Sequence, residues 1–339
     1  MSLPIQKNVP LQTLNTFGLP SSARYFASIT SDEDLRAGLQ FAAERNLDTL
    51  ILGGGSNLLL TRDVDALVLH MVGRGVRVVS DDGEQVVIEA EAGEPWHPFV
   101  LDTLARGLVG LENLSLIPGT VGASPIQNIG AYGVELKDVF EGLDAWDRHE
   151  GRIRSLDAGD CAFGYRDSRF KREPGRWIVL RVRFRLHRHA GLRLEYGAIR
   201  QWLKQDGIDS PTALDVSRAV CAIRREKLPD PAALGNAGSF FKNPVVDSAV
   251  AASLQAAHPG IVIYPQGDGS VKLAAGWLIE QAGWKGHREG DAGVHTLQAL
   301  VLVNHGAAHG EDILLLARRI QASVAERFGV VLEIEPSVL

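Results

Sequence analysis

The amino-acid sequence predicts an α+β protein of more than one domain, and three observations support this. The chain has 339 residues, more than one hydrophobic core usually organises. Runs with the two-residue alternation of β-strands dominate up to about Asp209, and mainly helical spacing of apolar residues follows. Two glycine-rich loops interrupt the first part. Changes of pattern near residues 73, 212 and 329 are the expected domain boundaries.

Local patterns predict the elements in chain order. Ser31 should cap a helix that Asn46 ends, and the runs between residues 66 and 90 should form one antiparallel or mixed meander. Strands are expected at 49–52, 66–70, 76–79, 86–90, 143–147, 152–156, 177–186, 299–304 and 330–335. Further helices are expected at 95–106, 210–229, 248–257, 273–281 and 311–328.

Composition excludes several classes of function. Apolar residues make up 45% and charged residues 22%, as in ordinary soluble enzymes, and a formal net charge of -6 offers no basic surface for nucleic acid or an anionic membrane. Cys161 and Cys221 stand far apart without a histidine at ligand spacing, so we expect neither a metal site nor a disulfide. The sequence shows no signal-peptide pattern at its start and no apolar run approaching the roughly 20 residues of a membrane span. We therefore expect a cytoplasmic protein.

Two glycine-rich loops are the first candidates for a binding site. The stretch LIPGTVGASPIQNIGAYG, residues 116–133, is uncharged and fits neither a helical nor a strand period. Such backbone can approach a ligand closely, and Ser124, Gln127 and Asn128 add polar groups for a planar partner. A glycine-rich loop packed in a core is the alternative. A second cluster, GGGSN at 53–57, matches neither a Rossmann loop nor a P-loop. Two such loops predict one long ligand.

Several polar residues are candidates for chemistry, each with a structural alternative. Ser239, within GNAGSFFKNP, could be a helix cap, an acyl nucleophile or a proton donor, and the absence of a G-x-S-x-G elbow disfavours the nucleophile. Arg166 could bind a carboxylate bidentately or pair with Asp167. Lys227 could contact a diphosphate or complement a helix end, and Glu335 would by default be an exposed carboxylate on an edge strand.

Taken together, the motifs resemble those of the UDP-N-acetylenolpyruvoylglucosamine reductase (MurB) family over nearly the whole chain. Tyr196 matches the substrate-capping tyrosine of the subtype with an extra tyrosine loop. The motifs are GGGSN at 53–57, SLIPGTVGASPIQNIGAYGVE at 115–135, FGYRDSRFK at 163–171, KLPDP at 227–231, GNAGSFFKNP at 235–244 and DGSVKLAAGWLIE at 268–280.

The resemblance implies a fold and a reaction. It implies a two-subdomain FAD-binding domain of the vanillyl-alcohol-oxidase (PCMH-type) fold, formed by 1–73 with 330–339 and by 74–212, plus an α+β substrate-binding domain at 213–329. It implies non-covalent FAD, NADPH as hydride donor, and a UDP-sugar substrate whose enolpyruvyl group is reduced in peptidoglycan synthesis. A monomer is expected, without nucleic-acid or membrane partners.

The resemblance also implies roles for single residues. Ser239 would donate the proton, while Arg166 and Glu335 would act on the substrate carboxylate and its enolic form. Substrate binding would involve Tyr165, Tyr196, Lys227 and Asn243. Cofactor binding would involve Gly53, Gly54, Gly55, Ser56, Asn57, Pro118, Gly119, Gly122 and Ser124.

Two alternatives stay open. The terminal Glu333-Ile334-Glu335-Pro336 departs from the usual Glu-Pro-Glu-Val of the family, so Glu333, on the same strand face, competes with Glu335. An FAD-linked oxidase of the same superfamily, or a nucleotide-binding module without activity, would share the glycine loops. Bleaching of a yellow protein by NADPH without oxygen would exclude the binding module.

Overall fold

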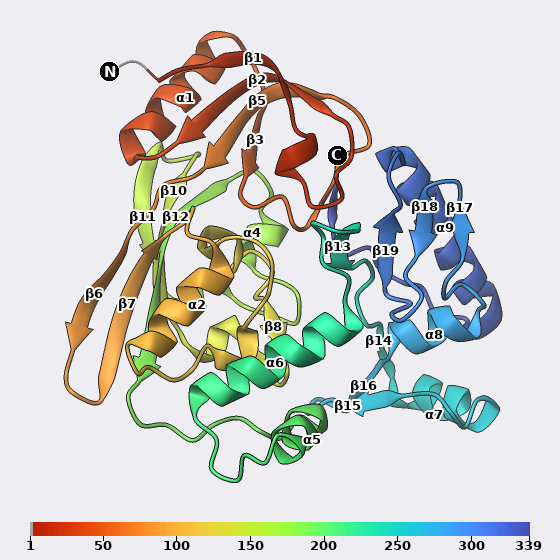
Figure 1. Cartoon of the computed structure of the whole chain (residues 1–339). Helices are drawn as coiled ribbons and strands as arrows, with labels where there is room; N and C mark the ends of the chain where they lie inside the picture. Colours follow the sequence, from red (N-terminus) through yellow and green to blue (C-terminus); the bar gives the residue numbers. More distant parts are fainter. Residues whose placement is uncertain (1–2) are drawn as a thin grey trace. The chain divides into compact units, whose positions relative to one another are not determined.

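The computed structural model describes residues 3–339, and the chain divides into two compact units (Figure 1). Unit 1 contains the chain up to Val9, Arg24–Gly54 and Asp65–Glu226. Unit 2 contains Pro10–Ala23, Gly55–Val64 and Lys227–Leu339. Two N-terminal segments therefore belong with the C-terminal third of the sequence.

Unit 1 is built on two β-sheets. One has the strand order β1-β2-β5-β3, in which β3 and β5 are parallel, and the other is an antiparallel sheet with the order β11-β10-β12-β7-β6. The strands are β1 (Gln6–Pro10), β2 (Ser22–Ile29), β3 (Thr49–Leu52), β5 (Val64–Met71), β6 (Val76–Asp81), β7 (Gln85–Glu91), β10 (Phe140–Asp147), β11 (Arg152–Leu156) and β12 (Trp177–His187), with a small hairpin of β8 (Gly130–Ala131) and β9 (Val134–Glu135). The helices are α1 (Asp32–Glu44), α2 (Trp96–Ala105), α3 (Ala158–Cys161), α4 (Arg169–Arg172), α5 (Gly197–Gln205) and α6 (Ala213–Lys227), with 3-10 turns η2 (Glu112–Leu114), η3 (Val121–Ala123) and η4 (Leu136–Asp138).

The long strand β12 contributes to two hydrophobic clusters of unit 1. A register shift in its pairing with β10, between Asp144 and Ala145, changes which side chains face each way. Ile178 and Leu180 pack in the cluster that includes Leu35 of α1, whereas Val182 and Phe184 pack in the cluster of α2. The bulge thus lets one strand support both sheets.

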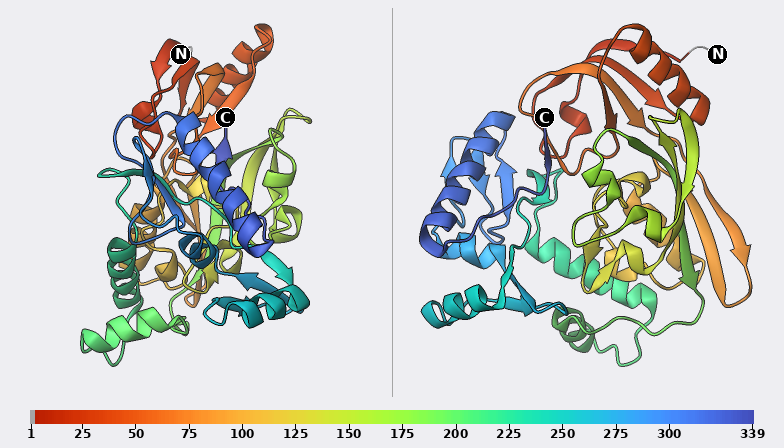
Figure 2. Two further views of the ribbon diagram at one scale, coloured as in Figure 1. Left: turned by 90° about the vertical axis from the view of Figure 1, so that its right-hand side faces the viewer. Right: turned by 180° about the vertical axis from the view of Figure 1, so that it is seen from behind.

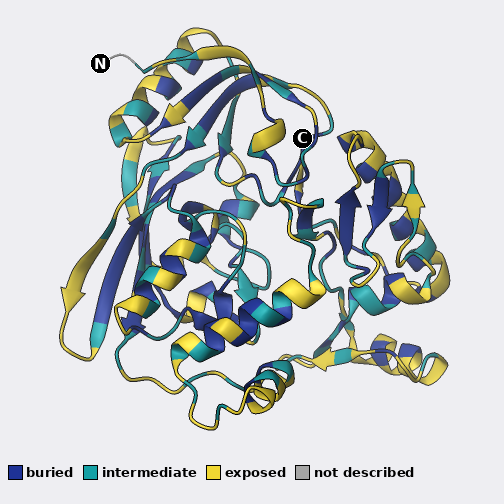
Figure 3. Cartoon of the chain, in the orientation of Figure 1, coloured by how far each residue is buried: buried dark blue, intermediate teal, exposed yellow. Residues whose placement is uncertain are grey.

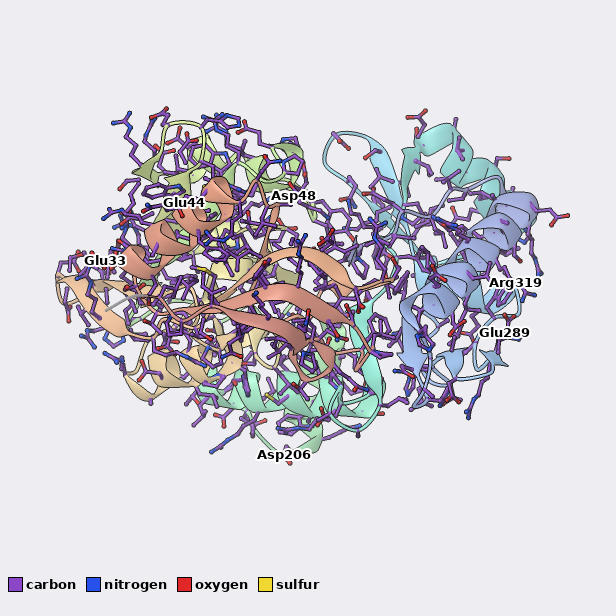
Figure 4. All side chains as sticks on the ribbon, turned by 90° about the horizontal axis from the view of Figure 1, so that it is seen from above. Glu33, Glu44, Asp48, Asp206, Glu289 and Arg319 are labelled. Atoms are coloured by element: carbon purple, nitrogen blue, oxygen red, sulfur yellow. The ribbon has the colours of Figure 1, made fainter. Side chains whose placement is uncertain are left out.

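Unit 2 is an α+β unit with two small sheets. Its larger sheet has the order β13-β19-β18-β17, and Figure 2 shows α9 lying across it. Leu302, Ile313 and Ile320 are completely buried in the core of this unit. Figure 3 shows the central strands of the sheet as buried and α9 with both buried and exposed residues. Arg319 of α9 pairs with Glu289 of β17 (Figure 4). The strands are β4 (Leu58–Leu59), β13 (Gly235–Ser239), β14 (Val245–Asp247), β15 (Ile263–Pro265), β16 (Ser270–Leu273), β17 (Arg288–Glu289), β18 (Ala292–Val294), β19 (Val301–Asn304) and β20 (Ser337–Val338), and the helices are η1 (Gln12–Leu14), α7 (Ser248–Ala257), α8 (Ala275–Gln281) and α9 (Gly310–Phe328).

Most predicted helices are present near their predicted bounds. The Ser31 hydroxyl accepts the Asp34 N–H as an N-cap, and Gly329 ends α9 in the left-handed conformation. Helix α5 was not predicted. Among residues 3–339, no helix is both long and apolar enough to cross a membrane.

Two sheet predictions were wrong. The run at 66–70 does not join a meander with 76–90, because β5 pairs with β3 and leaves β6 and β7 to the other sheet. The strand expected at 330–335 does not form. Ile334 makes an isolated bridge to Phe241, and the last strand is β20, which pairs in parallel with β4. A two-residue alternation of apolar residues indicates which side chains of a strand are buried, but it does not identify the strand that pairs with it.

Candidate active-site residues

The two glycine loops meet within unit 1. A Cβ atom on Gly54 would lie 2.9 Å from Gly119 Cα, and one on Gly53 would lie 2.8 Å from Thr120 Oγ1. On Gly122 it would lie 2.5 Å from Ala92 Cβ. Any side chain at Gly54 or Gly122 would therefore push backbone apart. These glycines therefore let the two loops pack closely against each other and against the Ala92 segment.

The remainder of the GGGSN motif lies in unit 2 and is anchored to backbone. Gly55 has a φ of 60°, and its carbonyl accepts the Thr16 N–H at 3.1 Å. A Cβ on Gly55 would lie 2.0 Å from Leu14 O, so only glycine fits. The Asn57 carbonyl accepts the N–H of Ser337, which ties the loop to β20.

Two polar residues of the central loop bond within the protein. The buried Ser124 hydroxyl donates to Val121 O at 2.6 Å. Asn128, also buried, donates to Gly164 O and to Glu135 Oε2, each at 3.0 Å. The amide of Asn128 therefore organises the loop, and the sequence reading of this side chain as a ligand group was wrong.

Arg166 is attached to the central loop by its own segment. Its Nη2 donates to Gly130 O at 2.7 Å, its backbone has a φ of 51°, and its guanidinium lies 5.8 Å from the Tyr165 ring. The neighbouring Ser168 hydroxyl donates to Ile126 O. The neighbouring Asp167 forms an ion pair with Arg172. A left-handed arginine held by several contacts is typical of functional sites.

Arg224 of α6 is a half-buried cation that was not among the residues predicted from the sequence. Its Nε donates to Leu116 O at 3.2 Å, and Tyr132 accepts a further hydrogen bond from its side chain. Burial lowers the pKa of Arg224, and the nearby charge of Arg166 lowers it further. No carboxylate of residues 3–339 forms an ion pair with Arg224 (salt bridges elsewhere are numerous). A partly buried guanidinium without a carboxylate partner among these residues indicates an anion site. Arg224 could have been found from the sequence by its position one helical turn before Lys227.

Tyr196 lies beside a cavity of unit 1. Its ring contacts the Tyr132 ring edge-to-face, with centroids 5.0 Å apart, and 47% of Tyr196 is exposed. The cavity has a volume of about 720 Å³. Its lining residues are Tyr132, Gly133, Gly191, Leu192, Arg193, Glu195 and Tyr196.

Ser239 is presented at the exposed end of a strand of unit 2. It ends β13, and the pairing of β13 with β19 has a register shift between Asn236 and Ser239. Gly238 has a φ of 70°, and its N–H donates to Asn236 Oδ1 at 2.9 Å. Bulges of this kind turn a side chain out of the sheet pattern. The helix-cap alternative is wrong, because no helix begins at Ser239.

Glu335 is tied next to Ser239 by backbone. The Glu335 N–H donates to Phe240 O, and the Lys242 N–H donates to Glu333 O, both at 2.9 Å. Glu335 is half-buried, whereas the Glu333 side chain is 68% exposed and pairs with Lys242. The two glutamates therefore have different surroundings, although they are two residues apart.

Asn243 and Lys227 lie at helix ends. The Asn243 Oδ1 accepts the N–H of Ala275, the first residue of α8, at 2.9 Å. This bond fixes the amide of Asn243 near a helix N-terminus, where backbone N–H groups favour anions. Lys227 is exposed and is the last residue of α6. Within residues 3–339, no group of three or more His, Cys, Asp or Glu residues is placed to hold a metal ion.

Comparison with known proteins places these residues in a known family. Residues 23–157 match the sequence model of an FAD binding domain, and residues 230–339 match that of the UDP-N-acetylenolpyruvoylglucosamine reductase C-terminal domain. UDP-N-acetylenolpyruvoylglucosamine reductases of Pseudomonas syringae pv. tomato and Pseudomonas aeruginosa are 63% and 61% identical over 338 residues, which is 100% of this chain and of each relative. The crystal structure of MurB from Thermus caldophilus is 26% identical, with a TM-score of 0.69 over 99% of both chains.

Proposed function

Because the chain belongs to the UDP-N-acetylenolpyruvoylglucosamine reductase family, we propose that it reduces UDP-N-acetylglucosamine enolpyruvate to UDP-N-acetylmuramate with NADPH, in peptidoglycan synthesis. The observation that carries this function is the 63% identity to such a reductase over the whole chain. The α+β FAD-binding fold agrees with it.

The glycine loops fit FAD. Gly54 lets the GGGSN loop lie against the central loop at Gly119, so backbone N–H groups of both loops can contact one pyrophosphate-containing ligand. When bound, FAD would supply the hydride transfer from NADPH to C3 of the enolpyruvyl group. The residues that would hold it without a covalent bond are Gly53, Gly54, Gly55, Ser56, Asn57, Pro118, Gly119, Gly122 and Ser124.

Cationic and polar residues would bind the substrate. Arg166 and Arg224 would each offer a guanidinium group to the enolpyruvyl carboxylate, and the Arg166 guanidinium lies 5.8 Å from the Tyr165 ring. Lys227 and the amide of Asn243 would hold the UDP diphosphate. Tyr196 would cover the bound sugar nucleotide, as in the subtype with the tyrosine loop.

Ser239 would supply the proton that completes the reduction. A hydride added at C3 moves an electron pair through C2 into the carboxyl group, and Arg166 stabilises the resulting charge. The Ser239 hydroxyl then gives its proton to C2, so the substrate gains one hydride and one proton in total. Glu335, held beside Ser239 by the Phe240 bond, adds a carboxyl group next to the enolic form.

We further propose the functional division into 1–73 with 330–339, 74–212 and 213–329, and a monomeric, cytoplasmic enzyme. The three functional parts need not coincide with the two compact units, because a subdomain can be assigned by its ligand as well as by its core.

Substitution Ser239→Ala tests the assigned proton donor. Anaerobic stopped-flow absorbance should show unchanged bleaching of the flavin by NADPH, while reduction of the enolpyruvyl substrate falls by about 10² to 10⁴, as expected for a lost general acid. Ser248→Ala, an exposed serine of the same unit, is the matched control. Equal loss in both half-reactions would show that Ser239 is structural, and no loss in either would remove it from the mechanism.

A further inference from the structure

Asn113 is a buried amide that joins two separate segments of unit 1. It lies in η2, just before the central loop, and is only 1% exposed. Its Nδ2 donates to Tyr132 O and to Arg193 O, each at 3.0 Å. The first carbonyl belongs to the central loop and the second to the tyrosine segment, which we define as residues 188–196.

The orientation of this amide is determined by its surroundings. Asn113 Oδ1 is buried and makes no hydrogen bond within residues 3–339. Turning the amide over would place Oδ1 against two carbonyl oxygens and would bury the two N–H groups without acceptors. The two donated bonds therefore account for the position of this polar side chain in the core.

The tyrosine segment has few other attachments. It connects β12 to α5 without regular structure, because β12 ends at His187 and α5 begins at Gly197. Among the described residues, the hydrogen bonds to the backbone of residues 189–195 come from Asn113 and from Arg200 Nε, which donates to Leu194 O at 2.8 Å. Arg200 is exposed. Leu192 and Leu194 also pack, partly buried, against the apolar cluster of α5 and α6. Asn113 is thus the buried polar attachment of the segment.

Both tyrosine rings beside the cavity depend on backbone near this amide. Asn113 fixes the carbonyl of Tyr132 itself and the carbonyl three residues before Tyr196. The Tyr132 backbone is left-handed, with a φ of 51°, so it needs external support. The edge-to-face contact of the two rings joins these anchored parts.

We propose that Asn113 is a positioning residue that locks the tyrosine segment over Tyr132 and thereby sets the affinity for the UDP-sugar. This proposal rests on the proposed role of Tyr196 in covering the substrate. Asn113 touches neither substrate nor cofactor in this account. It restricts the segment before the substrate binds, so that less conformational entropy is lost when the UDP-sugar binds.

Two substitutions remove the lock in different ways. Asn113→Ala deletes the amide, and Asn113→Asp keeps its shape while replacing the NH₂ group with oxygen. In both, hydrogen exchange of the 188–196 amides should accelerate. The KM for UDP-N-acetylglucosamine enolpyruvate should rise about tenfold, the size expected for two lost hydrogen bonds. The kcat should stay within about twofold, because the contact is remote from the reacting carbons.

The experiment compares hydrogen–deuterium exchange and steady-state kinetics of the FAD-loaded variants. Asn15→Ala is the control, since the buried Asn15 amide also donates to two carbonyls, Leu11 O and Leu19 O, outside the tyrosine segment. It should leave exchange of residues 188–196 unchanged. A Tyr196→Ala variant tests the underlying role separately, and it should raise the same KM.

Each outcome decides the question. Faster exchange confined to the Asn113 variants together with a raised KM supports the proposal. Unchanged exchange of residues 188–196 in both Asn113 variants overturns the proposal. Faster exchange with an unchanged KM also overturns it, provided that Tyr196→Ala raises the KM. If Tyr196→Ala leaves the KM unchanged, the proposed role of Tyr196 fails, and the proposal about substrate affinity fails with it.

Discussion

At the residue scale, Glu333 and Glu335 have the same side chain, but their contacts with neighbouring residues give the two carboxylates different surroundings. Ile334 between them bridges to Phe241, and both flanking residues bond to the backbone of residues 240–242. The Glu333 carboxylate pairs with Lys242 and is mostly exposed, while Glu335 is half-buried next to the segment that carries Ser239. This difference supports the choice of Glu335 as the functional carboxylate.

Substitution of each glutamate by glutamine should therefore have unequal effects. Glu335→Gln keeps the shape and removes the carboxyl chemistry beside the enolic form, so kcat should fall by about 10² or more. Glu333→Gln loses an exposed ion pair and should change kcat by less than about threefold. Steady-state turnover and flavin content of the two purified variants provide the test. If Glu333→Gln were the inactive variant, the assignment would have to move by two residues.

At the element scale, the two glycine loops depend on mutual contact. Gly54 and Gly119 approach so closely that a methyl group on Gly54 would meet backbone, which cannot move as an exposed side chain can. The contact therefore fixes the spacing of both loops.

Gly54→Ala should weaken FAD binding by at least about tenfold, because separating the loops costs about 1–3 kcal/mol of packing energy. The measurement is the flavin-to-protein absorbance ratio after dialysis. Gly267→Ala is the control, since Gly267 is exposed and a Cβ there would meet nothing within 4 Å. Full flavin content in Gly54→Ala would show that the loops do not form the FAD site.

The β10–β11 hairpin contains a buried carboxylate, Asp147, that forms an ion pair with Arg176. Asp147 ends β10 with its side chain fully buried, and Arg176 donates to it at 2.8 Å. That hydrogen bond, with those from the His149 and Glu150 N–H groups, holds the pKa of Asp147 at about 2, below its usual 3.8. A carboxylate with a lowered pKa stabilises the fold above its unfolded pKa, and this stabilisation disappears as the pH falls toward 2.

Asp147→Asn should therefore destabilise the protein most near neutral pH. Thermal unfolding midpoints of the parent and the variant should differ by several degrees at pH 6, and the gap should shrink as the pH falls from about 4 to about 2. A gap of constant size across this range would mean that the charge of Asp147 does not stabilise the fold. Asp65→Asn, at an exposed carboxylate paired with Arg24, is the control and should show little gap at either pH.

At the scale of the whole molecule, the residues with proposed functions belong to two units. Arg166, Arg224 and Tyr196 belong to unit 1, and Ser239, Asn243 and Glu335 belong to unit 2. The proposed roles therefore fall on residues of both units. Segments from the N-terminal part of the sequence, such as Gly55–Val64, are built into unit 2 and bond to the last residues of the chain.

The sequence predicted the local elements and the family better than it predicted the tertiary contacts. Caps such as Ser31, and the strand alternation of β12, depend on neighbours in sequence and were correctly read. The pairing of β5 with β3 and the anchoring of Glu335 by Phe240 depend on residues far away in the chain, which periodicity does not encode. Arg224 was missed for the same reason, since an arginine on a helix becomes an anion site only through the residues folded around it.

The most direct test of the central claim is a two-step anaerobic titration of the purified enzyme followed by flavin absorbance. NADPH should bleach the yellow flavin, and UDP-N-acetylglucosamine enolpyruvate should then restore the colour stoichiometrically, with UDP-N-acetylmuramate as the product. Flavin that NADPH reduces but only oxygen reoxidises would instead identify an oxidase, and would contradict the account.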